Sequence, residues 1–421
     1  MARILFLMPT KTYRASAFLL AAEKLALEVV VASERQQALE SLTENKTLTL
    51  DFSNPDGASE NIVAFATKVK LDAIIPVDED TVVIAALALK TLGLPHNSPK
   101  SAMAAREKPR MRRLLTDAGL PSPDFSLVSI EDDFASVARE MSYPCVLKPT
   151  FLSSSRGVIR ADDAGSFVNA ANRISAILEN LQLSTYDQKL AGQILVEDYI
   201  PGEEVALEGL LTEGHLKTLT IFDKPDPLTG PYFEETIYVT PSRHPESVQQ
   251  RLRQAVTAAA QAMGIRHGPV HAEIRINQDR IWILEIAARS IGGLCARALR
   301  FENDMSLEEL ILLHAIGEDV GHVKREENAS GVMMIPIPQK GTLRAVSGQK
   351  QALAVKHVDD IRITIPLSQE VVPMPEGNRY LGFIFARAET PQEVESALRE
   401  GHRKLVFDIG QPCEDSEPSQ G

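Results

Sequence analysis

The sequence is short of cysteine, of basic charge and of long apolar runs. Its three cysteines, Cys145, Cys295 and Cys413, lie far apart and fit neither a disulfide framework nor a CxxC metal site. Lysine and arginine total 44 against 57 aspartates and glutamates, which argues against a broad nucleic-acid surface or an anionic membrane face. The N-terminal MARILFLMP contains an apolar run of six residues, which is shorter than a signal-peptide core or a membrane span. We therefore expect a cytoplasmic protein that acts on small molecules.

Internal repeats are also absent, and 421 residues exceed one ordinary core, so two to four domains are expected. Strands at 4–8, 28–32 and 73–76 alternate with helices at 16–26 and 81–92, which predicts an open α/β domain. The acidic loop Asp78-Glu79-Asp80 follows a strand, at the edge where such sheets place ligands. An acid-rich helix N-terminus explains this loop equally well.

The stretch 268–293 has the clearest pattern. Apolar residues at even positions, including Trp282 and Leu284, alternate with charged residues at odd positions, which predicts two strands joined by a three-residue loop, 278–280. In that register Glu273 lies opposite Glu285, and facing carboxylates repel unless a cation neutralises them. Mg²⁺ prefers carboxylates together with phosphate oxygens. The alternative is a solvated hairpin whose acids pair with its arginines.

The residues after this hairpin also favour the interpretation as a metal-phosphate site. Arg289 offers a guanidinium suited to bidentate contact with an oxyanion, and Gly292-Gly293 let the backbone approach a ligand closely. Glu285, Ala287 and Arg289 share one face of a regular strand, so we expect the guanidinium on the metal side. The alternative for Arg289 is an ion pair with an acid such as Glu273.

Two earlier segments point to phosphate. After the linker 94–99, one helix is expected to end in a basic cluster, which is either a solvated face or a set of cations directed at phosphate: Arg106, Lys108, Arg110, Arg112 and Arg113. Lys148 lies inside the apolar strand 143–149, where an ammonium is costly unless it meets an anion. The loop LSSSRG (152–157) supplies hydroxyls and amides that can cover phosphates, although no P-loop motif occurs.

A buried strand at 194–198 then runs through the acidic turn of VEDYIPGEE into a second strand, which alone is an ordinary hairpin. The order of these motifs resembles that of the ATP-grasp superfamily. The motifs are a lysine before a lid, VLKP with a serine loop, VEDYIPGEE, and two glutamates followed by Arg and Gly-Gly. The motifs cover about residues 95–315, and the layout covers the whole chain. The resemblance implies ATP bound between two α+β subdomains and a carboxylate phosphorylated to an acylphosphate, which an amine then attacks.

The resemblance also implies an α/β and α+β fold in four parts. These are an N-terminal α/β domain (1–95), an ATP-grasp domain (96–316, with a lid subdomain at about 122–200), a C-terminal α+β domain (317–410) that closes the site, and a disordered tail (411–421). The cofactors implied are ATP and Mg²⁺, with Mn²⁺ able to replace Mg²⁺. The partners implied are a small-molecule carboxylate and amine, without nucleic acid or membrane, and a homodimer is allowed.

Carried residue by residue, the resemblance gives each site residue a role. Arg289 steadies the acylphosphate. The metal ligands are Glu273 and Glu285. Apart from the resemblance, we expect Glu79, His271, Gly292 and Gly293 to contact substrate. ATP is bound by Lys108 and Lys148 at its phosphates, by the loop Ser153, Ser154 and Ser155, by Glu197, Asp198 and Ile200 at adenine (the last two through backbone groups), and by Glu204 at the ribose.

The chain departs from the family at one metal position. Many members carry asparagine two residues after the second glutamate, where this chain has Ala287, and its loop is poorer in glycine than usual. HAEI, EIAARSIGG and FDKPDPLTGPYFEE are similar to ligases that join two amino acids into a dipeptide. The alternatives are a ligase or carboxylase of nucleotide or cofactor biosynthesis, and a nucleotide-binding protein without catalysis.

Overall fold

The computed structural model describes residues 1–35, 46–181, 183, 185–278 and 280–410. Among these residues, none of the helices combines the length and the hydrophobicity that a membrane crossing needs. Cys145 and Cys295 are buried and free, whereas Cys413 and the rest of the tail predicted to be disordered (411–421) lie outside the described residues.

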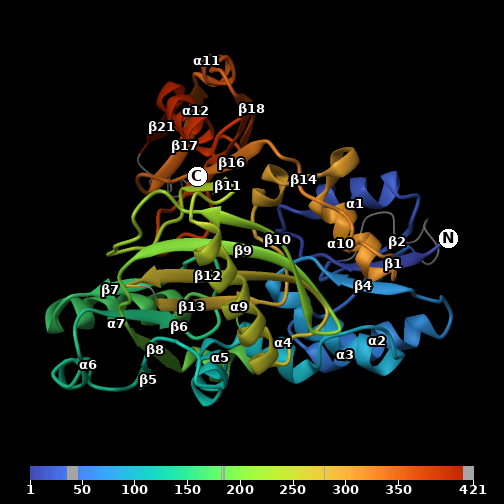
Figure 1. The fold of residues 1–421 in the computed structure, drawn as a ribbon. Coiled ribbons are helices and arrows are strands. Elements are labelled where there is room, and N and C mark those ends of the chain that lie inside the picture. The colour runs from blue at the N-terminus through green and yellow to red at the C-terminus, as the bar shows by residue number, and fades with distance from the viewer. Residues whose placement is uncertain (36–45, 182, 184, 279, 411–421) are drawn as a thin grey trace, which may run out of the picture.

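The N-terminal unit is a parallel sheet in the order β3-β2-β1-β4, at the right of Figure 1. In β1, Ile4 and Phe6 pack with α1 on one face while Leu5 and Leu7 pack with α2 and α3 on the other, which is why this strand is a continuous apolar run. The elements are β1 (Arg3–Leu7), α1 (Ala15–Lys24), β2 (Glu28–Ser33), β3 (Thr47–Thr49), α2 (Pro55–Ala66), β4 (Ala73–Pro76), the 3₁₀ helix η2 (Glu79–Thr81) and α3 (Val82–Leu92).

Two helices follow where the sequence predicted one. α4 (Pro99–Arg106) ends before Glu107, which is extended at φ −95° and ψ 100°, and α5 (Lys108–Asp117) begins directly after it. The cause is Pro109, which has no N–H to donate to the preceding turn and whose ring would clash with the carbonyl four residues back. The break places Lys108 at a helix start instead of mid-helix.

A second sheet, in the order β5-β8-β6-β7, carries the predicted phosphate loop. β6 and β7 form an antiparallel hairpin, and the segment between them includes residues 152–157, here called the serine loop. α7 covers this sheet through Phe167, Ile174 and their neighbours. The elements are β5 (Phe125–Ser129), α6 (Phe134–Val137), β6 (Cys145–Pro149), β7 (Ile159–Ala161), α7 (Ala164–Glu179), α8 (Thr185–Ala191) and β8 (Gln193–Asp198).

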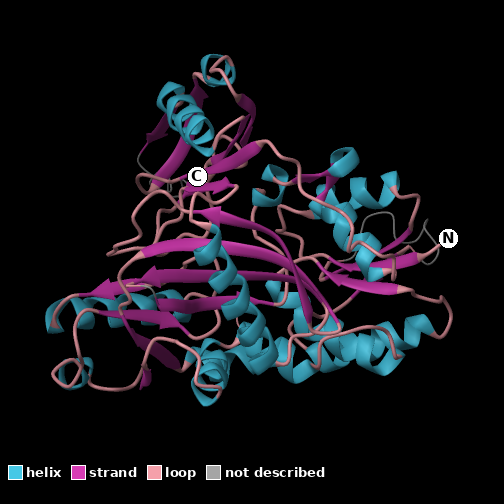
Figure 2. Ribbon diagram, viewed as in Figure 1, coloured by secondary structure: helices cyan, strands magenta, loops and turns pink. Residues whose placement is uncertain are grey.

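The largest sheet has eight strands in the order β13-β12-β9-β10-β11-β16-β20-β18 and crosses the centre of Figure 2. One face of its first strands packs on α9 and α5 through Ile274, Ile283, Val256 and Leu115. Its early elements are β9 (Glu203–Thr212), β10 (His215–Asp223), β11 (Ile237–Thr240), α9 (Glu246–Met263), β12 (Gly268–Asn277) and β13 (Arg280–Ala287).

The same sheet continues into the C-terminal part, because β11 pairs with β16 and β16 with β20. It therefore crosses the domain boundary predicted at 316/317, and the predicted domain limits stay predictions. The later elements are η3 (Cys295–Ala298), β14 (Arg300–Phe301), η4 (Glu302–Asp304), β15 (Met305–Ser306), α10 (Leu307–Ala315), β16 (Ala329–Ile335), β17 (Gly341–Ser347), α11 (Gln349–Leu353), β18 (Val358–Ile363), β19 (Glu370–Val371), β20 (Gly382–Ala388), α12 (Pro391–Lys404) and β21 (Val406–Gly410).

The predicted pairing of Glu273 with Glu285 is present, but the turn and the strand register that produce it differ from the prediction. Next to the turn, Asn277 pairs with Arg280, so the connection is one residue shorter than the three-residue loop expected. A β-bulge between this end and Glu273 leaves Leu284 as the extra residue and restores the expected register. Consequently the predicted alternation, with its apolar face at even positions, was wrong for Trp282 and Leu284. Ile281 and Ile283 face the core in their place.

Candidate active site

One cavity lies between the serine-loop sheet and the face of β9, β12 and β13 opposite α9. All site residues predicted from the sequence except Glu79 line it, and their individual roles stay predictions: Lys108, Lys148, Ser153, Ser154, Ser155, Glu197, Asp198, Ile200, Glu204, His271, Glu273, Glu285, Arg289, Gly292 and Gly293. Glu79 lines the adjoining groove. The structure thus brings together segments that lie up to 185 positions apart in the sequence, from Lys108 to Gly293.

Lys148 and Arg112 share one buried carboxylate. Glu197 Oε1 accepts from Arg112 Nε at 2.6 Å, and Glu197 Oε2 lies 2.6 Å from Lys148 Nζ. Arg112 also donates to the carbonyls of Ile283 and Leu284, at 3.2 and 2.6 Å, which are the carbonyls of the β13 bulge. Glu197 therefore orients the lysine predicted to meet phosphate, while its partner Arg112 supports the bulge that places Glu285.

Because of Glu197, the fold is expected to lose stability as the pH becomes acidic. Burial alone would raise its pKa, but the charges of Arg112 and Lys148 lower the pKa to about 2. Because the folded pKa is depressed, its contribution is complete above the unfolded pKa and is lost as the pH falls through the folded one. We expect the free energy of unfolding to fall by on the order of 3 kcal/mol between about pH 5 and pH 2. Urea unfolding across this range tests it, and a Glu197→Gln variant with an unchanged pH slope would contradict it.

Lys108 connects the serine loop to the predicted metal site. Its Nζ donates to the carbonyl of Leu152 at 2.6 Å and lies 3.6 Å from Glu285 Oε2. Of the five cations in the predicted basic cluster, Lys108 alone lines the cavity, and Arg112 is fully buried on Glu197. Arg113 is exposed, and Arg110 is half-buried and pairs with Glu107 at 3.1 Å, so the solvated-face interpretation fits Arg113 best.

Glu273 and Glu285 fit a divalent cation. They face each other across β12 and β13, and each side chain is about a quarter exposed, at 24% and 26%. Their nearest cations are not in close contact: Lys224 Nζ and His271 Nε2 are each 3.6 Å from Glu273, and Lys108 Nζ is 3.6 Å from Glu285. Carboxylate oxygens are therefore available to Mg²⁺, which prefers hard oxygen ligands.

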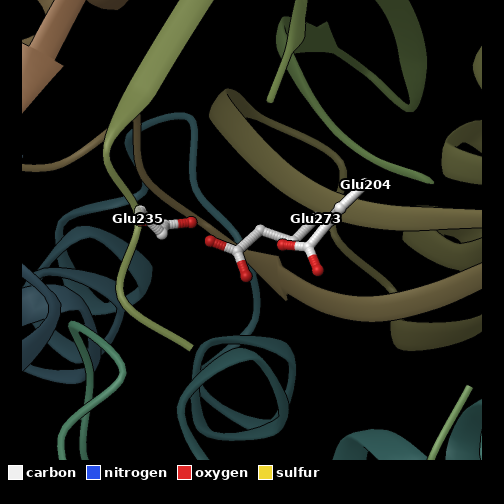
Figure 3. A group of neighbouring side chains, drawn as sticks. All are labelled: Glu204, Glu235 and Glu273. Atoms are coloured by element: carbon white, nitrogen blue, oxygen red, sulfur yellow. The ribbon is translucent and has the colours of Figure 1, made fainter. Parts of the chain in front are cut away.

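A second acidic group adjoins Glu273. The carboxylates of Glu204, Glu235 and Glu273 point toward one another, with ligand atoms within 4.8 Å (Figure 3). The ammonium of Lys224 pairs with all three, at 2.7 Å from Glu204 and 3.6 Å from Glu273 and in closest contact with Glu235. Arg275 Nε binds the other Glu204 oxygen at 2.9 Å. This group is thus already neutralised in large part by cations of the chain.

The acids of this group titrate differently because their surroundings differ. Burial raises the pKa of Glu235 to about 7, with Lys224 opposing and Glu273 adding to the effect. Burial also opposes ionisation of Glu273, but Lys224 and His271 outweigh it and hold the pKa of Glu273 well below its usual range. The facing pair therefore keeps an ionised carboxylate at Glu273, as a metal ligand must.

Arg289 pairs with Glu79, a residue of the acidic loop that the sequence placed at the ligand edge of the N-terminal sheet. Arg289 Nε lies 2.6 Å from Glu79 Oε2, so the ion pair weighed as the alternative forms, but with a different acid from Glu273. Arg289 Nη1 donates to the carbonyl of Ser290 at 3.0 Å. Within the described part of the chain, neither an ion pair nor a hydrogen bond engages Nη2, so the guanidinium retains donors for a ligand in the cavity.

His271 is held as a cation beside the predicted metal site. Its Nδ1 bonds Glu208 Oε1, and Glu208 Oε2 accepts from the N–H of Ile291 at 3.1 Å. Burial alone would lower the pKa of His271, but Glu208 raises it to about 9. Glu208 therefore orders both the histidine and the segment that leads from Arg289 to Gly292.

The predicted adenine segment has some of its backbone groups engaged already. The N–H of Asp198 donates to Asp124 at 3.0 Å, and the carbonyl of Ile200 accepts from Arg275 at 2.6 Å. The predicted recognition of a base by Asp198 and Ile200 would therefore use the other backbone group of each residue. Glu197 projects to Arg112 and Lys148, and Glu204 to Lys224 and Arg275.

Sequence reasoning assigned no individual role to Lys224, Glu235, Arg275 or Glu208. The available signal was a charge directly after, or inside, an apolar strand: Lys224 follows the run 219–222, and Glu208 interrupts the buried strand β9. Such charges are costly without partners. Their partners come from other strands, so the pattern alone did not identify them.

Comparison with known proteins agrees with the fold and the cavity. Residues 141–298 match the model of the ATP-grasp domain, residues 19–96 that of the ATP-grasp N-terminal domain, and residues 333–410 that of the L-amino acid ligase C-terminal domain 2. These matches place ATP-grasp domains over residues 19–96 and 141–298 and confirm the resemblance to the ATP-grasp superfamily.

Within that superfamily the chain is similar to ligases of amino acids. It is 28% identical to alanine–anticapsin ligase of Bacillus subtilis (strain 168) over 249 residues, which is 55% of this chain and 51% of that protein. It is 28% identical over 220 residues to D-alanine–D-alanine ligase of Neisseria gonorrhoeae, covering 50% of this chain and 66% of that one. The chain therefore spans about half to two thirds of the length of these curated relatives.

A solved structure resembles nearly the whole chain. The crystal structure of L-amino acid ligase from Bacillus licheniformis superposes with a TM-score of 0.82 at 24% identity, covering 98% of this chain and 99% of that one. This likeness shows that the ATP-grasp fold predicted from the sequence, with its N-terminal α/β and C-terminal α+β parts, is the fold of this protein.

Proposed function

We propose that this protein is an ATP-dependent carboxylate–amine ligase that joins two amino acids through an acylphosphate and releases ADP and phosphate. One observation carries the proposal: two lysines, two facing glutamates and Arg289 line a single cavity. Positive charge for phosphates, oxygen ligands for a divalent cation and a guanidinium for an oxyanion are the parts that phosphoryl transfer to a carboxylate needs. The match to an L-amino acid ligase C-terminal domain and the amino-acid ligases among its relatives support the substrate class.

In this proposal each residue acts at one stage. Lys108, Lys148 and the serine loop hold the phosphates, and Glu273 with Glu285 hold Mg²⁺, which Mn²⁺ can replace. The metal neutralises charge on the transferring phosphoryl group when it is bound. A carboxylate oxygen of the first amino acid attacks the γ-phosphorus, ADP leaves, and an acylphosphate results. The amine of the second amino acid then displaces phosphate, and the amide forms.

The experiment is a phosphate-release assay over pairs of amino acids, with nucleotide products separated by chromatography. We expect phosphate release only with an acceptable acid and amine together, ADP in equal amount to phosphate, and a dipeptide mass in the products. The physical reason is that attack at the γ-phosphorus leaves ADP. AMP and pyrophosphate as products, or phosphate release indifferent to amino acids, would contradict the proposal. The homodimer and the cytoplasmic location stay predictions, the first measurable by light scattering on the same preparation.

A further inference from the structure

The serine loop is tied to a segment of the C-terminal part, residues 373–378. The N–H of Gly157 donates to the carbonyl of Pro375 at 2.9 Å, and Arg156 Nε donates to the carbonyl of Glu376 at 2.9 Å. Arg156 and Glu376 are 220 positions apart. The loop predicted to cover phosphates is therefore held from outside its own hairpin.

Arg173 completes this connection from α7, the helix that covers the serine-loop sheet. Its guanidinium binds both Glu376 oxygens, with Nη2 to Oε2 at 2.8 Å and Nε to Oε1. Its Nη1 also donates to the hydroxyl of Tyr232, and the guanidinium lies 5.1 Å from the centre of that ring. We call the set Arg156, Gly157, Arg173 and Glu376 the clasp. A two-point contact of this kind fixes geometry as well as charge.

The backbone of the serine loop explains why it needs external support. Ser154 and Ser155 have φ values of 57° and 52°, which non-glycine residues rarely adopt. Such conformations persist only where surrounding contacts determine them. At Gly157, φ is 72° and a Cβ atom would stand 2.7 Å from Pro149 Cγ, so the residue whose N–H donates to the Pro375 carbonyl has little freedom.

We propose that Arg173 and Glu376 are positioning residues that hold the serine loop over the nucleotide phosphates, so that the segment 373–378 contributes to ATP affinity without lining the cavity. The proposal rests on the proposed function for its ligand, although the clasp itself does not. The contacts follow one path: Glu376 is fixed by Arg173, its carbonyl holds Arg156, the neighbouring Pro375 carbonyl holds Gly157, and Ser153 to Ser155 line the cavity immediately before them.

Trypsin gives a readout that needs no turnover, because it cleaves after arginine and Arg156 lies in the loop. We expect Glu376→Gln and Arg173→Gln each to raise the rate of cleavage between Arg156 and Gly157 by about fivefold, since a peptide bond held in a folded loop must open locally before a protease cuts it. The double variant should cleave no faster than either single variant, because both remove the same contact. Glu395→Gln is the matched control: among the described residues, Glu395 pairs with Arg243 at 2.8 Å and Arg399 at 2.9 Å, and neither belongs to the clasp.

Kinetics supply the second readout. The KM for ATP should rise about threefold to tenfold in both clasp variants, while the KM for each amino acid and the melting temperature stay close to those of Glu395→Gln. Cleavage at Arg156 no faster than in the control would overturn the clasp, and faster cleavage with an unchanged KM for ATP would overturn its positioning role. A wild-type protein that binds ATP, as measured by calorimetry, but joins no amino acids would count against the proposed function alone. In that case the clasp is still tested by how far ATP slows trypsin cleavage of the serine loop.

Discussion

Replacing Glu273 or Glu285 by glutamine is expected to reduce ligase turnover by about three decades, because loss of a metal ligand removes several kcal/mol of transition-state charge stabilisation. The two residues face each other, so neither can substitute for the other. Ala287 is fully buried and apolar, so water or phosphate oxygens must complete the coordination shell, and the wild-type enzyme should need a relatively high Mg²⁺ concentration.

The measurement is turnover as a function of Mg²⁺ concentration, with the melting temperature recorded for each variant. Glu203→Gln is a suitable control because Glu203 lies on the neighbouring strand β9 with 77% of its side chain exposed. Glu285→Gln is the cleaner of the two tests, since Glu273 also pairs with Lys224. Half or more of wild-type turnover in both variants at saturating Mg²⁺ would exclude this pair as the metal ligands.

Arg289→Lys is expected to cut amide formation by roughly two decades or more while ATP binding stays nearly intact. A point charge cannot replace a planar guanidinium that donates in two directions at a tetrahedral oxyanion. The structure sharpens this test because Nε is occupied by Glu79, and a lysine can still neutralise that buried carboxylate. Burial raises the pKa of Glu79, and the charge of Arg289 opposes this. A substitution that removes the positive charge at position 289 would therefore leave Glu79 buried without that partner, and would disturb the fold as well as the chemistry.

Calorimetry with ATP and a phosphate-release assay on the same Arg289→Lys protein separate the two possible roles. Glu79→Gln is the companion variant. If Arg289 served only as the partner of Glu79, the two variants should lose stability to a similar degree and the lysine variant should keep its turnover. Normal turnover of Arg289→Lys, or a loss confined to nucleotide binding, would remove Arg289 from the catalytic set.

Much of the fold and most of the cavity lining could be predicted because the signals were local. Period-two alternation identified β12 and β13, and the order of short motifs along the chain identified the superfamily. The cavity then follows from the fold, since the motifs lie on strands and loops that the two sheets bring face to face.

What could not be predicted depends on residues distant in sequence. The bulge at Leu284 has no local signature, because the arginine that binds its carbonyl lies 172 positions away. For the same reason the facing of Glu273 and Glu285 was predicted through a loop of the wrong length. The partner of Arg289 also escaped prediction: Glu79 reaches it from the N-terminal sheet, whereas sequence proximity favoured Glu273. Charges that neutralise one another in a buried group, such as Lys224 with Glu235, are paired by tertiary structure alone.

The continuous eight-stranded sheet limits how this protein can be engineered. A chimera joined at residue 316 would exchange β16, β18 and β20 while keeping β11, and would have to recreate the ladder in which Ile237 to Thr240 pair with Met333 to Ser330. A truncation there would leave β11 as an uncovered edge, a template for aggregation. Libraries that recombine substrate specificity should therefore cross over in connections outside the sheet, and should transfer the serine loop together with the 373–378 segment that binds it.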